Sequence, residues 1–347
     1  MNKWLAVPDL TKKNVYKQIA EKTGMSSFAV EKDWWVVQTL SAIFDLEVGN
    51  NLIFKGGTSL SKAWKLIERF SEDIDIIIDR DFLGFSGELT KSKREQLRKR
   101  AGEYTVKTIF PELQQVFCER GISGLRFNLV ETTESDRDPR TIEIIYPHLI
   151  EPTQYLKPVV KIEIGCRSLI EPYTVKTFSS LVDEEYAEFE FSSAPINIPT
   201  VNPERTFLEK IFLLHEEFHR TAENRRSDRL SRHLYDIFKI SKTDISEKAL
   251  NDKDLYQIIV EHRYNFSKVG GVNYNELQPK LINMLPSPLI MGEWKSDYET
   301  MLEQMIYEEN PPSFDDMIKE LTLLKERINN LKWKFDLEFP VPIQHAD

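Results

Sequence analysis

Two aspartates interrupt an otherwise apolar run in the segment DIDIII, residues 73–78. If this segment is a strand, Asp73 and Asp75 point to one side while Ile74 and Ile76 face the opposite layer, because side chains alternate along a strand. Two carboxylates this close repel each other unless a cation lies between them. Hard divalent cations such as Mg²⁺ prefer oxygen ligands and often combine one or two carboxylates with substrate phosphates. The pattern therefore indicates phosphoryl chemistry, and a solvated strand end is the alternative.

A glycine pair, Gly56 and Gly57, stands upstream of these aspartates in the segment FKGGTSLSK. Glycine lets the backbone approach a ligand closely, and N–H groups at the start of a following helix can bind anionic oxygens. An ordinary strand-to-helix turn is the alternative. The side chains that could add donors near the pair are Lys55, Thr58, Ser59 and Lys62.

Glu163 is the candidate for a third carboxylate. In VVKIEIG, residues 159–165, Lys161 and Glu163 share one strand face within an apolar run, and charges placed there need a partner or a metal. A third carboxylate would complete a two-metal site, in which one ion activates the attacking oxygen and the other stabilises the leaving group. A Lys–Glu cross-strand pair is the alternative.

Composition limits the classes of protein that fit. The chain has 347 residues, of which 41% are hydrophobic, so two globular domains are expected. A formal net charge of -10 argues against extensive wrapping of nucleic acid and leaves room for local basic patches. Two cysteines, Cys118 and Cys166, are expected to be free thiols in a reducing compartment. The sequence lacks the uninterrupted run of about 18 apolar residues that a membrane span needs, so we expect a cytoplasmic protein without membrane contact.

The elements that must position these residues follow from hydrophobic periodicity. Helical patterns cover 10–24 and 31–44, a strand covers 51–55, and a helix is expected from about Thr58 to Phe70. A long helix is expected from Thr90 to Phe117, broken near Pro111. Further strands are predicted at 125–133, 141–146, 159–165 and 173–182, and weakly at 187–191.

From Pro203 onward the patterns are helical: 203–220, 228–240, 254–266, 298–308 and 314–331. The boundary is placed near Ile196 to Asn202. The sequence thus predicts an α+β domain over residues 1–200, with a helical prelude, and a C-terminal helical domain over residues 201–347.

The order GGTSL, helix, RFSEDID resembles the nucleotidyltransferase toxins of the AbiEii/AbiGii family, in the DNA polymerase β-like nucleotidyltransferase superfamily. Four further segments are similar to that family: EKDWWV near residue 31, KIEI, LEKIF, and RHLYDIF after it. The resemblance spans roughly residues 31–240. It implies a nucleotidyltransferase-fold mixed sheet with flanking helices and a C-terminal helical domain.

The resemblance also implies roles for individual residues. Asp73 and Asp75 would bind Mg²⁺ (or Mn²⁺), Glu163 would be a ligand or a base, and Asp236 would be the acid of the last motif. Arg232 and His233 stand where the family often has Arg then Asp, so the segment before Asp236 departs from the family's motif. Arg232 and Asp236 could instead form a plain surface ion pair. The residues assigned to the NTP are Gly56, Gly57, Thr58, Ser59, Lys62 and Lys210.

The resemblance implies transfer of a nucleotide from an NTP to an RNA acceptor, with tRNA 3′ ends among the family's targets, and release of pyrophosphate. It further implies a toxin of a toxin–antitoxin or phage-defence system, neutralised by a cognate antitoxin. Two basic clusters are candidates for RNA contact, Lys91 to Arg100 and Arg220 to Arg232. Each could equally be a solvated helix face.

The segment HEEFH, His215 to His219, satisfies the H-E-x-x-H pattern of zinc metalloproteases. A protease site would need a third protein ligand and an apolar setting, and Glu217 and Arg220 place charge there. An exposed, charged helix face is the alternative. A catalytically inert module that binds a partner through the C-terminal helices is a further alternative.

Overall fold

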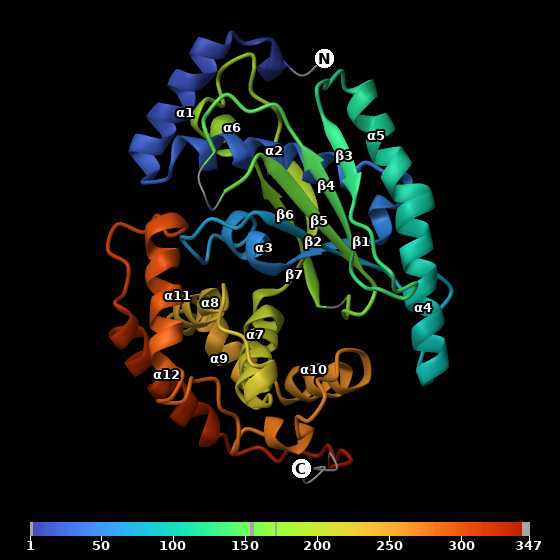
Figure 1. Ribbon diagram of the computed structural model, residues 1–347, viewed down its shortest axis with the longest axis vertical. Helices are drawn as coiled ribbons and strands as arrows, with labels where there is room; N and C mark the ends of the chain where they lie inside the picture. Colours follow the sequence, from blue (N-terminus) through green and yellow to red (C-terminus); the bar gives the residue numbers. More distant parts are fainter. Residues whose placement is uncertain (1–2, 153–155, 171, 342–347) are drawn as a thin grey trace. The chain divides into compact units, whose positions relative to one another are not determined.

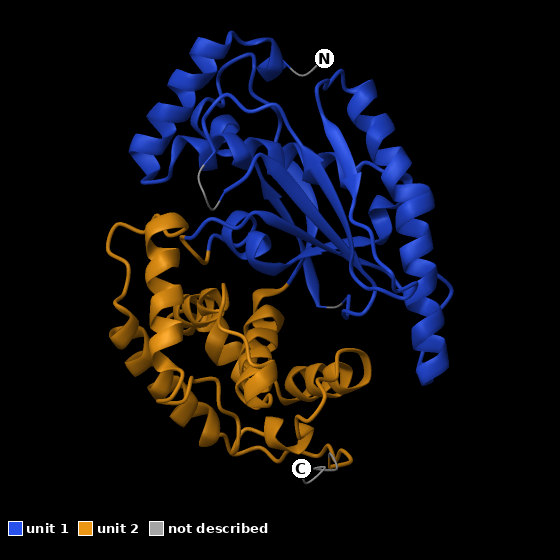
Figure 2. Cartoon of the chain, in the orientation of Figure 1, with its two compact units in different colours: residues 1–65, 69–201 blue, residues 66–68, 202–347 orange. Residues whose placement is uncertain are grey.

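The computed structural model describes residues 3–152, 156–170 and 172–341. The chain forms two compact units, shown in different colours in Figure 2. Unit 1 comprises Met1–Lys65 and Arg69–Val201, and unit 2 comprises Leu66–Glu68 and Asn202–Asp347. The main change of unit falls at Val201/Asn202, and a three-residue excursion of the chain, between helix α3 (Gly56–Lys62) and strand β2 (Asp73–Ile78), also belongs to unit 2.

Unit 1 is built on a seven-stranded mixed sheet with the order β3-β4-β5-β2-β1-β7-β6 (Figure 1). Neighbours β2 and β5 are parallel, as are β1 and β7, and the other neighbours are antiparallel. This mixed sheet with flanking helices confirms the predicted fold class. The strands are β1 Leu52–Lys55, β2 Asp73–Ile78, β3 Arg126–Leu129, β4 Arg140–Ile145, β5 Val159–Gly165, β6 Tyr173–Phe178 and β7 Ile196–Val201.

Strands β2 and β5 show why the sequence alternates as it does. Ile74, Ile76, Ile162 and Ile164 are at most 1% exposed, whereas the charged residues between them are half-buried. The isoleucines therefore anchor both strands in the core, and the charged side chains occupy the other face of the sheet.

The helices of unit 1 flank the sheet. Helix α2 is buried along most of its length, and α1 ends at Gly24, whose φ of 74° is the left-handed conformation that the predicted cap requires. The helices are α1 Asp9–Thr23, α2 Ser27–Phe44, α3 Gly56–Lys62, α4 Lys91–Tyr104, α5 Phe110–Glu119 and α6 Leu181–Glu185, with short 3₁₀ turns η1 Lys3–Ala6 and η2 Glu47–Asn51.

Two expectations about these helices are corrected. The helix expected to reach Phe70 ends at Lys62, and Lys65 just beyond it has a left-handed φ of 52°, which a helix does not accept. The helix expected to break near Pro111 continues from α4 to α5 through one π-helical segment, η3 Thr105–Ile109. The wider turn of that segment precedes the proline, which has no N–H to donate.

The weak strand expected at 187–191 is absent there, and β7 lies instead at Ile196–Val201, which the sequence pattern assigned to the boundary. Pro199 lies within β7 opposite Val175, and a proline in the middle of a strand is unusual. Because of this proline, the sequence pattern of the strand is interpreted as a linker between domains.

Unit 2 is helical. Its helices are α7 Pro203–Phe218, α8 Ser231–Ser241, α9 Asp244–Asn251, α10 Lys253–Phe266, α11 Met291–Gln304 and α12 Phe314–Asn329, with 3₁₀ turns η4 Ala222–Asn224 and η5 Tyr274–Leu277. Lys239 of α8 bonds Glu68 at 2.6 Å and Glu308 at 2.9 Å, and the N–H of Tyr307 donates to the carbonyl of Glu68 at 3.0 Å. These contacts hold the 66–68 excursion within unit 2.

Neither cysteine is in a disulfide, as predicted: Cys118 is exposed and Cys166 is buried. Among the described residues, no helix combines the length and the apolar character that crossing a membrane requires.

Candidate active site

The predicted acidic residues meet on adjacent strands of unit 1. In the parallel pairing of β2 with β5, Asp73 lies opposite Lys161 and Asp75 lies opposite Glu163. Adjacent strands are about 4.8 Å apart, so these four side chains form one charged patch on one face of the sheet. Lys161 Nζ lies 2.7 Å from Glu163 Oε1. The structure thus brings Glu163 beside Asp73 and Asp75, which lie 90 and 88 residues earlier in the sequence.

The charges of this patch act on Lys161. Burial alone would lower the pKa of Lys161, but the hydrogen bond to Glu163 and the charges of Glu163, Asp73 and Asp75 outweigh it and raise that pKa above its ordinary value. The ammonium group therefore sits in the field of all three carboxylates.

The glycine turn lies directly against this patch. Gly56 has φ +83°, and a Cβ on it would come 1.9 Å from Oδ2 of Asp75, so no other residue fits without moving that carboxylate. A Cβ on Gly57 would meet Arg69 Nη2 and Ser71 Oγ, both at 2.8 Å. Gly56 is therefore favoured by its backbone conformation and by the close carboxylate, whereas a side chain at Gly57 would displace the ends of Arg69 and Ser71.

Thr58 and Ser59 fix the turn through their hydroxyl groups. Thr58 Oγ1 donates to the backbone carbonyl of Asp73 at 2.5 Å, and Ser59 Oγ donates to the carbonyl of Gly56 at 2.8 Å. Both side chains are buried. In this structure the Thr58 hydroxyl joins the turn to the aspartate strand and the Ser59 hydroxyl bonds within the turn, and a role for either in binding an NTP stays a prediction.

Lys210 and Asp236, predicted from separate motifs, are in contact within unit 2. Lys210 Nζ of α7 lies 2.9 Å from Asp236 Oδ2 and 3.2 Å from His233 Nδ1 of α8. Lys210 is 7% exposed and Asp236 is fully buried, so the alternative of a surface pair between Arg232 and Asp236 is wrong. His233, which departs from the family's pattern, thus contacts the motif lysine directly. The five predicted catalytic residues form two clusters, one in each unit.

A family model described as a nucleotidyl transferase AbiEii toxin of a type IV toxin–antitoxin system matches residues 38–320, most of the chain. The chain belongs to the AbiEii family. It is therefore a nucleotidyltransferase, and its family is one of toxins that are paired with an antitoxin. The comparison with curated protein sequences gave no match.

Two solved structures are distantly similar to the chain. MenT4, a nucleotidyltransferase toxin from Mycobacterium tuberculosis, is 16% identical with a TM-score of 0.44, over 90% of this chain and 92% of its own. JHP933 from Helicobacter pylori is 14% identical with a TM-score of 0.42, over 86% of this chain and 92% of its own. The assignment to the AbiEii family rests on the family model.

Helix α2 supports this candidate site through three consecutive buried charges, to which the sequence motifs assign no role. Lys32 Nζ bonds Glu72, the residue before Asp73, at 2.7 Å. Asp33 Oδ1 bonds Lys62, the last residue of α3, at 2.7 Å. Glu31 accepts the backbone N–H groups of Leu149 and Ile150 at 2.7 and 3.0 Å.

Two of these links end at the segments that carry the site, the start of β2 and the end of α3. The run of charges in EKDWWV, at the beginning of an otherwise apolar helix, was the signal that could have revealed them. Lys62 therefore has a structural partner in this AbiEii protein, and its predicted contact with an NTP would compete with that ion pair.

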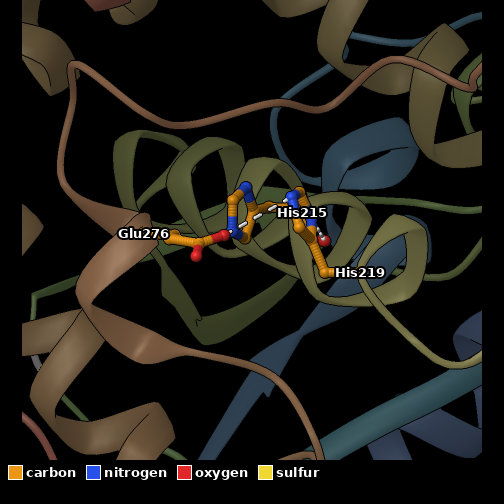
Figure 3. A group of neighbouring side chains, drawn as sticks. All are labelled: His215, His219 and Glu276. Carbon is orange, nitrogen blue, oxygen red and sulfur yellow. Dashed lines mark hydrogen bonds and ion pairs between the residues drawn. The ribbon is translucent and has the colours of Figure 1, made fainter. Parts of the chain in front are cut away.

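The HEEFH motif lies in α7, where the rings of His215 and His219 stack with centroids 3.9 Å apart (Figure 3). With Glu276 of η5 they place potential ligand atoms within 4.8 Å of one another. However, His215 Nδ1 accepts the backbone N–H of Asn283 at 3.0 Å, and burial and the neighbouring His219 lower the pKa of His215 to about 3. The neutral ring therefore carries its proton on Nε2, which is buried and has no hydrogen-bond partner among the described residues. A protonated nitrogen cannot bind a metal.

The two glutamates of the motif form ion pairs and hydrogen bonds with other residues. Glu216, the residue that acts as general base in a zinc metalloprotease, bonds both Arg263, at 2.9 Å to Nε, and the hydroxyl of Tyr274 at 2.9 Å. Glu217 bonds Arg226 at 2.6 Å. Because His215, Glu216 and Glu217 are at most 3% exposed, the alternative of an exposed helix face is wrong, and the motif is a buried structural network of unit 2.

The two basic clusters are partly neutralised by local acids. In the first, Arg98 bonds Asp136 at 2.5 Å and Lys99 bonds Glu95 at 3.1 Å. In the second, Arg220 as well as Arg226 bonds Glu217. Each cluster is therefore less basic than its sequence indicates.

Proposed function

We propose that this AbiEii protein transfers a nucleoside monophosphate from an NTP to an RNA acceptor, with tRNA the favoured class, and releases pyrophosphate. Unit 1 would act as the nucleotidyltransferase domain and unit 2 as the C-terminal helical domain. The observation that carries the proposal is the register of β2 and β5, which sets Asp75 beside Glu163 and next to the Gly56 turn.

The donor set of unit 1 fits a hard divalent cation. Asp73, Asp75 and Glu163 offer carboxylate oxygens on one sheet face, the ligand type that Mg²⁺ and Mn²⁺ prefer. The ion, when bound, would neutralise phosphate charge and orient the triphosphate. Close approach of the Gly56–Gly57 backbone, which has no Cβ to exclude the phosphates, supports the predicted triphosphate position.

The reaction would join an acceptor hydroxyl oxygen to the α-phosphorus while the bond from that phosphorus to the bridging oxygen breaks. Pyrophosphate leaves with the bonding electrons, and Glu163 is the candidate to take the hydroxyl proton. Lys210, held by Asp236, would offset the charge that develops on the phosphates. Asp73 and Asp75 contribute by positioning and charge rather than by covalent chemistry.

The partners follow from this reaction. Exposed basic residues of α4, such as Lys91, Lys93 and Arg100, are candidates for contact with the phosphate backbone of RNA. A cognate antitoxin is implied by the family's type IV toxin–antitoxin assignment. Because NTPs and tRNA are cytoplasmic molecules, we propose a cytoplasmic site of action.

The test is to incubate the protein with each α-labelled NTP and Mg²⁺, in the presence of purified tRNA, total RNA or protein extract. Label should appear on RNA with the wild-type chain. It should be lost in Asp73→Asn and Asp75→Asn, which remove charge at nearly constant volume, with folding checked by circular dichroism. Label on protein would show that the acceptor is a protein rather than RNA. Label that persists in the Asp73→Asn, Asp75→Asn double variant would show that the active site lies elsewhere. No label at all would favour the catalytically inert binding module.

A further inference from the structure

We propose that Lys161 is a positioning residue that serves as the built-in counter-cation of the acidic site, and that its ammonium group competes with the divalent cation for the carboxylates. This inference rests on the proposed function, because it takes Asp73, Asp75 and Glu163 to be the metal ligands.

The strand register places the ammonium among those ligands. Lys161 lies opposite Asp73 across the β2–β5 pair, and its Nζ contacts Oε1 of Glu163, which itself lies opposite Asp75. The 2.7 Å contact occupies one oxygen of the third carboxylate. A cation that uses Glu163 as a ligand must therefore displace the ammonium or share that carboxylate with it.

Neighbouring lysines have other partners. Lys55, at the end of β1, lies opposite Asp75 in the β1–β2 pair, and its Nζ bonds Ser168 Oγ at 2.7 Å, whereas Lys62 bonds the buried Asp33. Lys161 contacts a predicted metal ligand, Glu163, directly through its ammonium. Removal of its charge would increase the repulsion among the three carboxylates in the metal-free protein.

The chemistry of the side chain suits an exchangeable occupant. The Lys161 side chain is 40% exposed, so its ammonium can move into water without opening the core. Lysine is a compact charge on a flexible stem, whereas arginine would form a bidentate pair with Glu163 that is harder to displace. Lys161 therefore stabilises the arrangement of the acidic residues in the metal-free protein and still allows a divalent cation to bind there.

The inference is tested with Mn²⁺ alone, without nucleotide, by titration calorimetry or by electron paramagnetic resonance of free Mn²⁺. Lys161→Met should bind Mn²⁺ about tenfold more tightly than wild type, because one like charge near the dication is removed. Its metal-free form should melt at a lower temperature, and saturating Mn²⁺ should raise the melting temperature more than in wild type. Lys161→Arg should restore metal-free stability and bind Mn²⁺ no more tightly than wild type.

The matched control is Lys17→Met, which removes the same charge from an exposed pair with Glu21 and should leave both measurements unchanged. If Lys161→Met fails to fold, lysine acetylation of the wild-type protein, read by mass spectrometry, supplies the answer. Saturating Mg²⁺ should increase the labelling of Lys161 and leave Lys17 unaffected.

The outcomes separate the two proposals. Unchanged or weaker Mn²⁺ binding by Lys161→Met, or Lys161 labelling that ignores Mg²⁺, overturns the counter-cation role while the proposed function stands. Undiminished Mn²⁺ binding by the Asp73→Asn, Asp75→Asn double variant overturns the metal site itself, and with it the proposed function.

Discussion

The identity of Gly56 is fixed twice, by its left-handed backbone and by the carboxylate of Asp75 beside it. Gly56→Ala should cost about 1–2 kcal/mol of stability through the backbone alone. Transfer activity should be lost because the new Cβ displaces the carboxylate. Gly84→Ala is the matched control, since Gly84 has a similar φ of +87° with nothing within 4 Å. Chemical denaturation and labelled transfer measure both effects, and a fully active Gly56→Ala would show that Asp75 need not occupy this position.

The contact between Lys210 and Asp236 gives the second prediction at this scale. Because both side chains are buried, Lys210→Met should cost about 3–5 kcal/mol by removing the ammonium that pairs with the buried carboxylate of Asp236. The double variant Lys210→Met, Asp236→Leu should recover much of that stability in urea denaturation. It should remain inactive, because the charge that offsets the phosphates is absent. A stable, active double variant would remove both residues from the catalytic set.

At the scale of elements, α2 links segments that are far apart in sequence. Its charged residues bond the start of β2, the end of α3 and the backbone near residue 150. The α2 partner in each bond is buried, so each bond is sensitive to loss of the other partner. Helix α2 therefore holds the glycine turn and the aspartate strand at a fixed distance from each other, and these bonds are called the α2 frame.

The ion pair of Lys62 with Asp33 tests this frame. Lys62→Met should destabilise the fold by about 3 kcal/mol, because Asp33 stays buried without its partner. The KM for NTP of the folded fraction should stay close to that of wild type. If instead stability is unchanged and the KM rises, Lys62 is the nucleotide ligand that the family motif implies.

Glu31 gives α2 a pH dependence. Burial, opposed by hydrogen bonds from Ile150 and Leu149, raises the pKa of Glu31 from 4.5 to about 7. The folded state therefore holds a proton more tightly than the unfolded state, and the stabilisation is complete below about pH 4.5 and declines as pH rises toward about 7. Unfolding free energies across this range should fall with pH in wild type and fall less steeply in Glu31→Gln. Equal slopes would show that Glu31 titrates normally.

At the scale of the whole molecule, local secondary-structure patterns could be predicted from the sequence, whereas pairings between distant segments could not. The two-residue period of DIDIII and KIEI predicted the charged faces, but their side-by-side placement depends on the order of strands in the sheet. Lys62 reads as part of the glycine motif, and its partner Asp33 lies 29 residues earlier on another element. A proline inside β7 concealed a strand.

The excursion of Leu66–Glu68 was equally hidden, since three residues carry no periodicity. It means that the chain changes unit three times, at 65/66, 68/69 and 201/202. A protease that cuts only at the last junction would release residues 1–201, which retain residues 66–68 of unit 2, with Glu68 still bonded to Lys239 of the other piece. The nicked protein should therefore purify as one particle, and separate expression of residues 1–201 and 202–347 would divide unit 2 rather than isolate it.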